Sequence, residues 1–464
     1  MAKKRDVMYV CDVCGYDSAK WYGKCPNCGT WNSMREARGV VVLSGSVGKK
    51  TKAKVDVRKI GEVEVSKNVR ISTGFAEFDR VLGGGEGAQG IVPGEIVLLS
   101  GDPGVGKSTI LLQIALTLSG REAKLQNSKE KQQESRREKM KVLYITGEES
   151  ESQVRMRAER IVSESDLKDF DLLILSTVDT DAAMAAIQKE APALVIVDSI
   201  QTIASESLSG FAGSVPQIRY ATSQLVNLGK GMGIPIFMIG HVTKEGIVAG
   251  PQLLSHMVDV VLYLEGELTT GTRILRAYKN RFGDTSEVGI FLMEERGLVE
   301  LSDASTFFMD RRDSAVPGSC LTVVMEGSRP ILVEIQALSV PSSLAFPRRV
   351  SNGIDNKRLE LLLAVLQRHL NLRVDKNDIF VNVVGGLTIK EVGVDLAVCL
   401  AIVSSLRDVP LDSICAISEI GLLGELKSVA AENLRVREAK RLGAKSVVTS
   451  EQGHFLRQIV EKVM

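Results

Sequence analysis

Long apolar runs are missing from this sequence of 464 residues. No run approaches the roughly 18 apolar residues that a membrane-spanning helix needs, and Met1 is not followed by the apolar core of a secretory signal. We therefore expect a cytoplasmic protein with no membrane partner. Internal repeats of the kind that build solenoids are missing too, which argues against that class of fold.

An excess of charge of either sign is also missing. Lys and Arg number 58, and Asp and Glu number 57, which leaves a formal net charge of +1. Such a balance gives little long-range attraction to nucleic acid, so any contact with DNA must come from local basic patches. With 44% hydrophobic and 25% charged residues the chain can bury large cores, and its length suits two or three domains.

Changes in composition divide the chain into four segments. Residues 1–31 hold a compact cysteine-rich unit, and residues 32–66, rich in Gly, Ser and Lys, are expected to be a linker. Residues 67–305 alternate aliphatic strands with helical patterns, which is typical of an α/β domain with a parallel sheet. Residues 306–464 have the pattern of a separate α+β domain, and the polar stretch 121–141 is expected to be an exposed insertion.

Two CxxC pairs lie near the N-terminus, Cys11 with Cys14 and Cys25 with Cys28. Four thiolates from two tight turns give the closed tetrahedral site that structural Zn²⁺ prefers, and the metal would supply the stability that so small a core cannot. A redox CxxC is the alternative, but two pairs without a thioredoxin-like βαβ setting favour zinc. The remaining three cysteines have apolar neighbours and are expected to be buried: Cys320, Cys399 and Cys415.

A glycine-rich turn follows the apolar strand expected at 96–100 and precedes an apolar helix expected at 110–118. It has the P-loop spacing G-x-x-x-x-G-K-[ST] in the strand–turn–helix setting that this motif requires. Its backbone amides and the helix N-terminus would hold the phosphates of ATP, Lys107 would reach the β- and γ-phosphates, and Ser108 would ligate Mg²⁺. The predicted nucleotide-binding residues are Gly101, Asp102, Pro103, Gly104, Val105, Gly106, Lys107, Ser108 and Thr109.

Three further strand ends carry side chains suited to ATP hydrolysis. Asp198 ends the apolar strand 194–198 and is predicted to hold Mg²⁺ opposite Ser108. Strand 142–146 is followed by Glu148 and Glu149, of which Glu148 is the first choice for the carboxylate that orients the attacking water. The alternative is that these two acids only cap the next helix. His241 follows strand 236–239 and is predicted to sense the γ-phosphate.

Several segments together resemble one family of bacterial DNA-repair proteins. Residues 71–85, just before the P-loop, are similar to the opening of RecA-type recombinase cores. The four-cysteine unit, the P-loop and the segments 146–150, 240–246 and 279–283 follow one another as in the RadA (Sms) family, over essentially the whole chain. The resemblance implies a RecA-like P-loop ATPase core with an N-terminal zinc finger.

The same resemblance implies a DNA-dependent ATPase in recombinational repair. It would form a homo-oligomeric ring, expected to be a hexamer, on single-stranded DNA and promote branch migration of intermediates begun by a RecA-type recombinase. ATP would lie between subunits, where Lys279 and Arg281 reach a neighbour's γ-phosphate or the DNA. The residues alone favour solvated surface for this pair, on a loop after a strand. The loops near 205–216 and 244–251, with Arg219 and Lys244, would face DNA.

Residues 306–464 resemble the proteolytic domain of Lon-type proteases, which use a Ser–Lys dyad. The serine position falls on Gly393 and the lysine position near Asn433, so the dyad is missing. The resemblance therefore implies a non-proteolytic scaffold for ring assembly. Basic faces that could contact DNA are expected at Arg348–Arg349, Lys357–Arg358 and Arg435/Arg437.

Two other classes of function stay open. One is an ATP-dependent protease, which the missing dyad disfavours. The other is a clock-type or signalling RecA-like ATPase that acts on proteins, which the cysteine unit and segment 279–283 disfavour. Stimulation of ATP hydrolysis by single-stranded DNA would separate this second class from a DNA motor.

Overall fold

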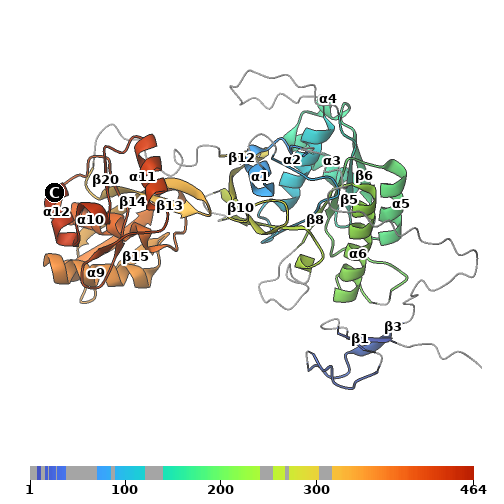
Figure 1. Ribbon diagram of the computed structural model, residues 1–464, viewed down its shortest axis with the longest axis horizontal. Coiled ribbons are helices and arrows are strands. Elements are labelled where there is room, and N and C mark those ends of the chain that lie inside the picture. Colours follow the sequence, from blue (N-terminus) through green and yellow to red (C-terminus); the bar gives the residue numbers. More distant parts are fainter. Residues whose placement is uncertain are drawn as a thin grey trace, which may run out of the picture. The chain divides into compact units, whose positions relative to one another are not determined.

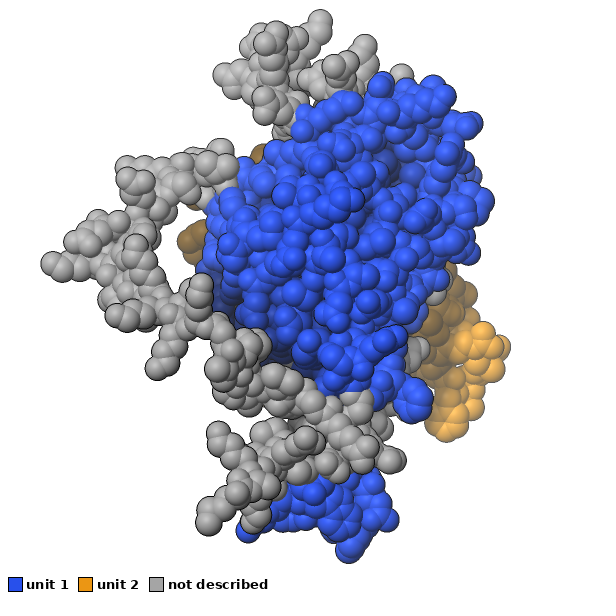
Figure 2. Space-filling view, turned by 90° about the vertical axis from the view of Figure 1, so that its right-hand side faces the viewer, with its two compact units in different colours: residues 1–266, 271–300 blue, residues 267–270, 301–464 orange. Residues whose placement is uncertain are grey.

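The structure is a computed structural model of the 464-residue chain. It describes residues 8–11, 16–18, 20–27, 29–37, 70–84, 89–120, 139–208, 210–240, 254–266, 271–301 and 316–464. The chain forms two compact units, one of residues 1–266 and 271–300 and the other of residues 267–270 and 301–464 (Figure 2). Within the described residues, no helix combines the length and apolar character needed to cross a membrane.

Nine of the described strands of the first unit join in one sheet, in the order β12-β11-β10-β9-β4-β8-β7-β5-β6 (Figure 1). The six strands from β9 to β6 run parallel, and β10, β11 and β12 extend the sheet antiparallel. The strands are β4 (Ile96–Gly101), β5 (Val142–Thr146), β6 (Leu172–Ser176), β7 (Leu194–Asp198), β8 (Ile236–Ile239), β9 (Val260–Gly266), β10 (Thr272–Asn280), β11 (Val288–Glu294) and β12 (Gly297–Glu300).

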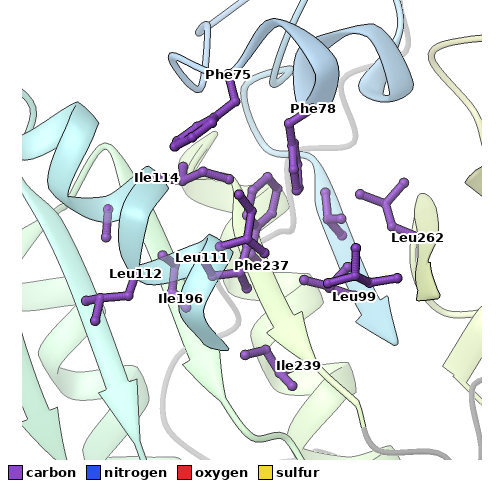
Figure 3. Close-up of a cluster of buried hydrophobic side chains, with 14 of the residues drawn as sticks. Phe75, Phe78, Leu99, Leu111, Leu112, Ile114, Ile196, Phe237, Ile239 and Leu262 are labelled. Carbon is purple, nitrogen blue, oxygen red and sulfur yellow. The ribbon is translucent and has the colours of Figure 1, made fainter. Parts of the chain in front are cut away.

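Helices cover both faces of this sheet because its central strands are apolar on both sides. Along β4, Val97 and Leu99 belong to one buried cluster and Ile96 and Leu98 to another. The first cluster includes side chains of α1, α2 and α3, with Phe78 and Phe237 rings 6.1 Å apart (Figure 3). The second includes side chains of α5 and α6. The helices are α1 (Ala76–Leu82), α2 (Lys107–Ser119), α3 (Glu151–Ile161), α4 (Glu164–Leu167), α5 (Thr180–Glu190) and α6 (Val215–Met232).

The α/β pattern expected for the P-loop domain is confirmed, with two differences at its antiparallel edge. Strand β12 was not expected, since its four residues follow a two-residue turn and carry no clear period. Strand β10 continues through Lys279, which was expected on a loop, to Asn280, because a register shift between Ala277 and Lys279 lets pairing with β9 resume. Lys279 therefore lies in a strand and not in a loop.

The N-terminal segment forms a small antiparallel sheet in the order β2-β1-β3. Its strands are β1 (Met8–Cys11), β2 (Asp17–Ser18) and β3 (Met34–Ala37). Strand β3 lies inside the segment expected to be linker. It belongs to the cysteine unit because Met34 is buried in one cluster with Cys11 and Cys25.

The second unit is built on a six-stranded mixed sheet in the order β15-β16-β14-β13-β17-β20, with a separate pair β18-β19. Helix α10, buried from Asp395 to Ser404, packs against β13 and β14. The three single cysteines are buried, as expected: Cys320, Cys399 and Cys415. The elements are β13 (Ser319–Glu326), β14 (Arg329–Pro341), β15 (Arg349–Asn352), α9 (Asn356–Leu370), β16 (Asn377–Val383), α10 (Asp395–Arg407), β17 (Ile414–Ala416), β18 (Glu419–Ile420), β19 (Leu426–Lys427), α11 (Glu432–Arg441), β20 (Ser446–Val448) and α12 (Leu456–Val463).

The apolar stretch from Ile414 to Ile420 forms two short strands, β17 and β18, and not one continuous strand. Ser418 leaves the sheet between them because its N–H donates to the Gly393 carbonyl at 3.0 Å, while its own carbonyl accepts from the Leu396 N–H at 3.2 Å. The chain is thus bound to the start of α10 where the apolar pattern alone predicts continued pairing.

Candidate active site

The P-loop joins β4 to α2 and has the backbone shape of an anion cradle. Gly101 and Gly106 have φ of 147° and 110°, which favour glycine. A Cβ at Gly101 would lie 2.2 Å from the Leu264 carbonyl oxygen, and one at Gly106 would lie 2.6 Å from the Met293 methyl carbon. The first turn of α2 contains no acidic residue that would repel an anion. The loop therefore fits phosphate both sterically and electrostatically.

Lys107 is held over this loop by its own backbone. Its ammonium donates to the carbonyls of Gly101 at 2.8 Å and Asp102 at 2.9 Å, and only 4% of the residue is exposed. Burial lowers the pKa of Lys107, while the charges of Asp198, Asp102 and Glu148 oppose that shift. A phosphate in the loop would offer this ammonium stronger acceptors than two carbonyls.

Two of the predicted carboxylates meet at the carboxyl edge of the parallel sheet. Strands β5 and β7 are neighbours, with Thr146 opposite Asp198, so the residues after β5 lie beside the end of β7. Asp198 is 5% exposed and accepts a hydrogen bond from the Tyr144 hydroxyl at 2.5 Å. Glu148 accepts one from the Ser199 hydroxyl at 2.7 Å. Asp198 fits a magnesium-shell role, and Glu148 fits the orientation of water.

Sequence reasoning missed three side chains that contact these acids: Tyr144, Arg157 and Ser199. Tyr144 stands in the middle of buried β5, where a hydroxyl needs a partner, and that need was the available signal. Burial, and after it the charge of Asp198, raises the pKa of Tyr144 well above its ordinary value, so the hydroxyl keeps its proton and donates. The positions of Arg157 and Ser199 depend on how the chain turns after β5 and β7.

A pocket lies beside the first turn of α2, between α3 and the turn that joins β11 to β12. Its position next to Thr109, at the end of the P-loop, suits the nucleoside part of a ligand whose phosphates occupy the loop. Charges of both signs line its wall: Arg157 and Arg160 of α3 and Arg296 are positive, and Glu294 and Glu295 are negative. The lining residues are Thr109, Leu112, Arg157, Arg160, Ile161, Met293, Glu294, Glu295, Arg296 and Gly297.

The P-loop follows the carboxyl end of β4, whereas Lys279 and Arg281 lie near the amino end of that strand, at the opposite edge of the parallel sheet. Lys279 donates to the carbonyls of Ser255 at 2.6 Å and Val258 at 2.8 Å. Arg281 pairs at 3.1 Å with Asp259, whose other carboxylate oxygen accepts from the backbone N–H of Ile96, the first residue of β4. The length of β4, roughly 17 Å at about 3.3 Å per residue, separates this edge from the loop. Within one chain the two cations are far from the phosphate site.

The cysteine unit closes two turns in the same way. Cys11 N–H donates to the Tyr16 carbonyl and Cys25 N–H to the Thr30 carbonyl, each at 2.9 Å and each five residues along. Cys11 and Cys25 are both buried, so their sulfur atoms suit a closed metal site. Gly29, after the second pair, has φ of 72°, as such a turn requires. Cys14 and Cys28 lie outside the described residues.

Two family models match the chain: one described as an AAA domain, over residues 88–246, and one described as a rubredoxin metal binding domain, over residues 9–36. Among solved structures, the crystal structure of the RadB recombinase is 22% identical with a TM-score of 0.36, and the match covers 50% of this chain and 99% of that one.

Curated relatives extend the match to nearly the whole chain. The DNA repair protein RadA of Bacillus subtilis (strain 168) is 44% identical over 456 residues, which is 97% of this chain and 93% of that protein. RadA of Halalkalibacterium halodurans is 44% identical over 462 residues, 97% of this chain and 94% of its own. This chain belongs to the RadA family of DNA repair proteins.

Membership in the RadA family confirms the fold expected from the sequence. The first unit is a RecA-like P-loop ATPase core, which makes the chain an ATP-hydrolysing enzyme, and the N-terminal ribbon binds zinc. His241, predicted to sense the γ-phosphate from its place after a strand, and Lys244, expected to face DNA, lie outside the described residues. Strand β8 runs parallel to β7, so its carboxyl end lies at the same side of the sheet as Asp198.

In the second unit of this RadA-family chain, a cation lies beside Gly393, the residue that the Lon resemblance aligns with the serine. A Cβ at Gly393 would lie 3.1 Å from Nη1 of Arg435, which donates to the Val323 carbonyl at 2.7 Å. Arg435 is 2% exposed and pairs with Glu391 through two hydrogen bonds of 2.7 and 2.5 Å. The expectation that Arg435 forms part of a basic DNA-binding face is wrong, because its charge is buried in this pair.

Arg358, expected on a similar face, is also engaged inside the unit. Its guanidinium donates to both carboxylate oxygens of Asp395 and to the Ile420 carbonyl. Arg348, Lys357 and Arg437 differ in that none is buried. Each of the three basic pairs expected from the sequence thus has at least one exposed cation.

Proposed function

We propose that this chain is a DNA-dependent ATPase that promotes branch migration of recombination intermediates on single-stranded DNA as a homo-oligomeric ring, a hexamer, together with a RecA-type recombinase. The observation that carries the proposal is the separation of the two edges of the sheet. Lys107 and Asp198 lie at one edge and Lys279 and Arg281 at the other. Cations placed so far from their own phosphate site would act on the phosphate site of a neighbouring subunit or on DNA.

The chemistry of hydrolysis divides among the residues at the first edge. The loop amides and Lys107 bind and orient the phosphates, and Ser108 with Asp198 would hold Mg²⁺, which neutralises phosphate charge when bound. Glu148 orients the attacking water in line with the γ-phosphate. Lys279 and Arg281 of the neighbour would then stabilise the charge that develops in the transition state.

The loop before α6 supports contact with DNA. Phe211 is 90% exposed there, and Arg219 is exposed on the helix that follows. Hydrogen bonds hold the loop in this conformation, because the side-chain amide of the buried Gln217 donates to the carbonyls of Ser205 at 3.0 Å and Leu208 at 2.7 Å. An exposed aromatic ring and an exposed cation on the same loop–helix segment can stack with unpaired bases and bind their phosphates.

ATP hydrolysis measured with and without single-stranded DNA, at two salt concentrations, tests the proposal. We expect a stimulation of at least about tenfold that weakens at high salt, because phosphate contacts release counterions. Lys107→Ala is the control that removes turnover with and without DNA, since the phosphates lose the only ammonium seen in the loop. A wild-type rate that DNA does not change would contradict the proposed DNA activity and leave the ATPase.

The proposal assigns the second unit a scaffold role without peptide hydrolysis. Gly393 offers no nucleophile, and Arg435 fills the space beside it with a charge that cannot serve as a general base. Degradation of casein in the presence of ATP would contradict this part of the proposal.

A further inference from the structure

Arg157 joins three groups around the phosphate site and has no assigned role. It extends from α3, and its Nη2 atom lies 2.7 Å from a carboxylate oxygen of Glu149, 3.3 Å from the Tyr144 hydroxyl and 3.8 Å from Asp198 Oδ2. Its side chain is 18% exposed, and it also lines the pocket beside Thr109. The Arg157 guanidinium thus lies between Glu149 and Asp198, the predicted magnesium ligand, and also forms part of the pocket wall.

Local structure brings this side chain back to the acids. Ser150 caps α3 with both halves of a capping box, which fixes where the helix begins directly after Glu149. Helical side chains point toward the helix N-terminus, so an arginine two turns into α3 reaches the residues before the cap. The contact depends on this geometry and not on proximity in the sequence.

The two neighbouring glutamates consequently have different partners. Glu148 accepts a hydrogen bond from the Ser199 hydroxyl, which is a neutral donor. Glu149 pairs with the Arg157 guanidinium, which compensates its charge. Without Arg157, the Glu149 carboxylate would lack this cation close to Asp198.

We propose that Arg157 is a positioning residue for ATP hydrolysis: it neutralises Glu149 and, with Tyr144, orients Asp198, so that Glu148 alone acts as the water-orienting carboxylate. The proposal rests on ATP turnover at the P-loop and not on the DNA activity. It makes Glu149 a partner of Arg157 and takes it out of the set of water-orienting carboxylates.

The test compares Arg157→Ala with Arg155→Ala in steady-state ATP hydrolysis by the full chain. Arg155 is on the same helix but pairs outward with Glu159 at 2.8 Å, so its variant controls for a change of charge on α3. We expect Arg157→Ala to lower kcat by about 10- to 100-fold, as loss of an outer partner of a metal ligand does. KM for ATP should change less, because the loop amides and Lys107 are intact. Arg155→Ala should match the wild type.

A second variant separates this role from packing or pocket contact. If Arg157 acts by compensating Glu149, then Glu149→Gln added to Arg157→Ala should raise kcat about threefold or more above the single Arg157→Ala variant. Three results would overturn the proposal: an unchanged kcat in Arg157→Ala, a rise in KM alone, or no recovery in the double variant. A wild-type chain without turnover would instead contradict ATP hydrolysis at this site, so the two failures are distinguishable.

Discussion

The buried carboxyl of Glu95 makes the stability of this fold depend on pH. Glu95 precedes β4 and is fully buried, with one oxygen accepting from the Val92 N–H at 2.7 Å and the other lacking a hydrogen-bond partner within the described part of the chain. Burial raises the pKa of this carboxyl to about 7. The folded chain therefore binds a proton that the unfolded chain releases at lower pH, and stability falls as pH rises between the two pKa values.

Glu95→Gln should remove this pH dependence. Above pH 7 the variant should be more stable than the wild type by about 3 kcal/mol, because the amide carries no charge to bury. Below about pH 4.5, the ordinary value for Glu, both chains have a neutral group there and the gain should vanish. Urea unfolding at pH 8 and pH 4 measures the difference. An equal gain at both pH values would show that Glu95 is not the titrating group.

At the scale of residues, the sequence indicated the phosphate site better than its surroundings. A P-loop and an acid at a strand end are local patterns, and parallel strands bring such ends together, so the proximity of Asp198 and Glu148 could be expected. Tyr144, Ser199 and Arg157 could not, because each contact depends on strand order or on where α3 begins. The catalytic roles assigned to these residues stay predictions.

At the scale of elements, α11 shows that the pattern of a helix does not reveal which of its cations is buried. The helix carries Arg435 and Arg437, which the sequence presents as equivalent basic residues. The structure buries the first in its pair with Glu391 and leaves the second exposed. The alternation of strands and helices followed from periodicity, whereas which arginine faces inward depended on how closely Arg435 packs against Gly393.

Arg435→Ala should destabilise the second unit by about 3 kcal/mol, because Glu391 would lose its partner and the Val323 carbonyl its donor. Arg437→Ala on the same helix is the matched control and should stay within about 0.5 kcal/mol of the wild type. Urea unfolding of the full chain, followed for the transition of this unit, provides the measurement. Equal losses in both variants would contradict the burial of Arg435.

At the scale of the whole molecule, the two edges of the RecA-like sheet predict complementation between damaged chains. Lys107→Ala loses the phosphate site but keeps the cations at the far edge, and Lys279→Ala does the reverse. Each should lose DNA-stimulated hydrolysis when assayed alone. In an equal mixture, about a quarter of the interfaces would join an intact phosphate site to an intact Lys279 of the neighbour.

We therefore expect the mixture to recover up to roughly a quarter of the wild-type DNA-stimulated rate, provided the subunits exchange. Rates measured as the mixing ratio is varied provide the test, with Lys107→Ala mixed with wild type as the reference for dilution. A mixture no more active than the mean of its two components would contradict a site shared between subunits.

The distance between the two edges of the sheet gives any row of these chains a direction. The edge that holds the phosphates and the edge that offers the cations are different surfaces, so a contact that joins them is head-to-tail and cannot be two-fold symmetric. An open row would end with one phosphate site that no neighbour completes and, at the other end, one pair of cations without a substrate. Only a closed ring completes every phosphate site, and each open end leaves one site without the cations that its hydrolysis needs.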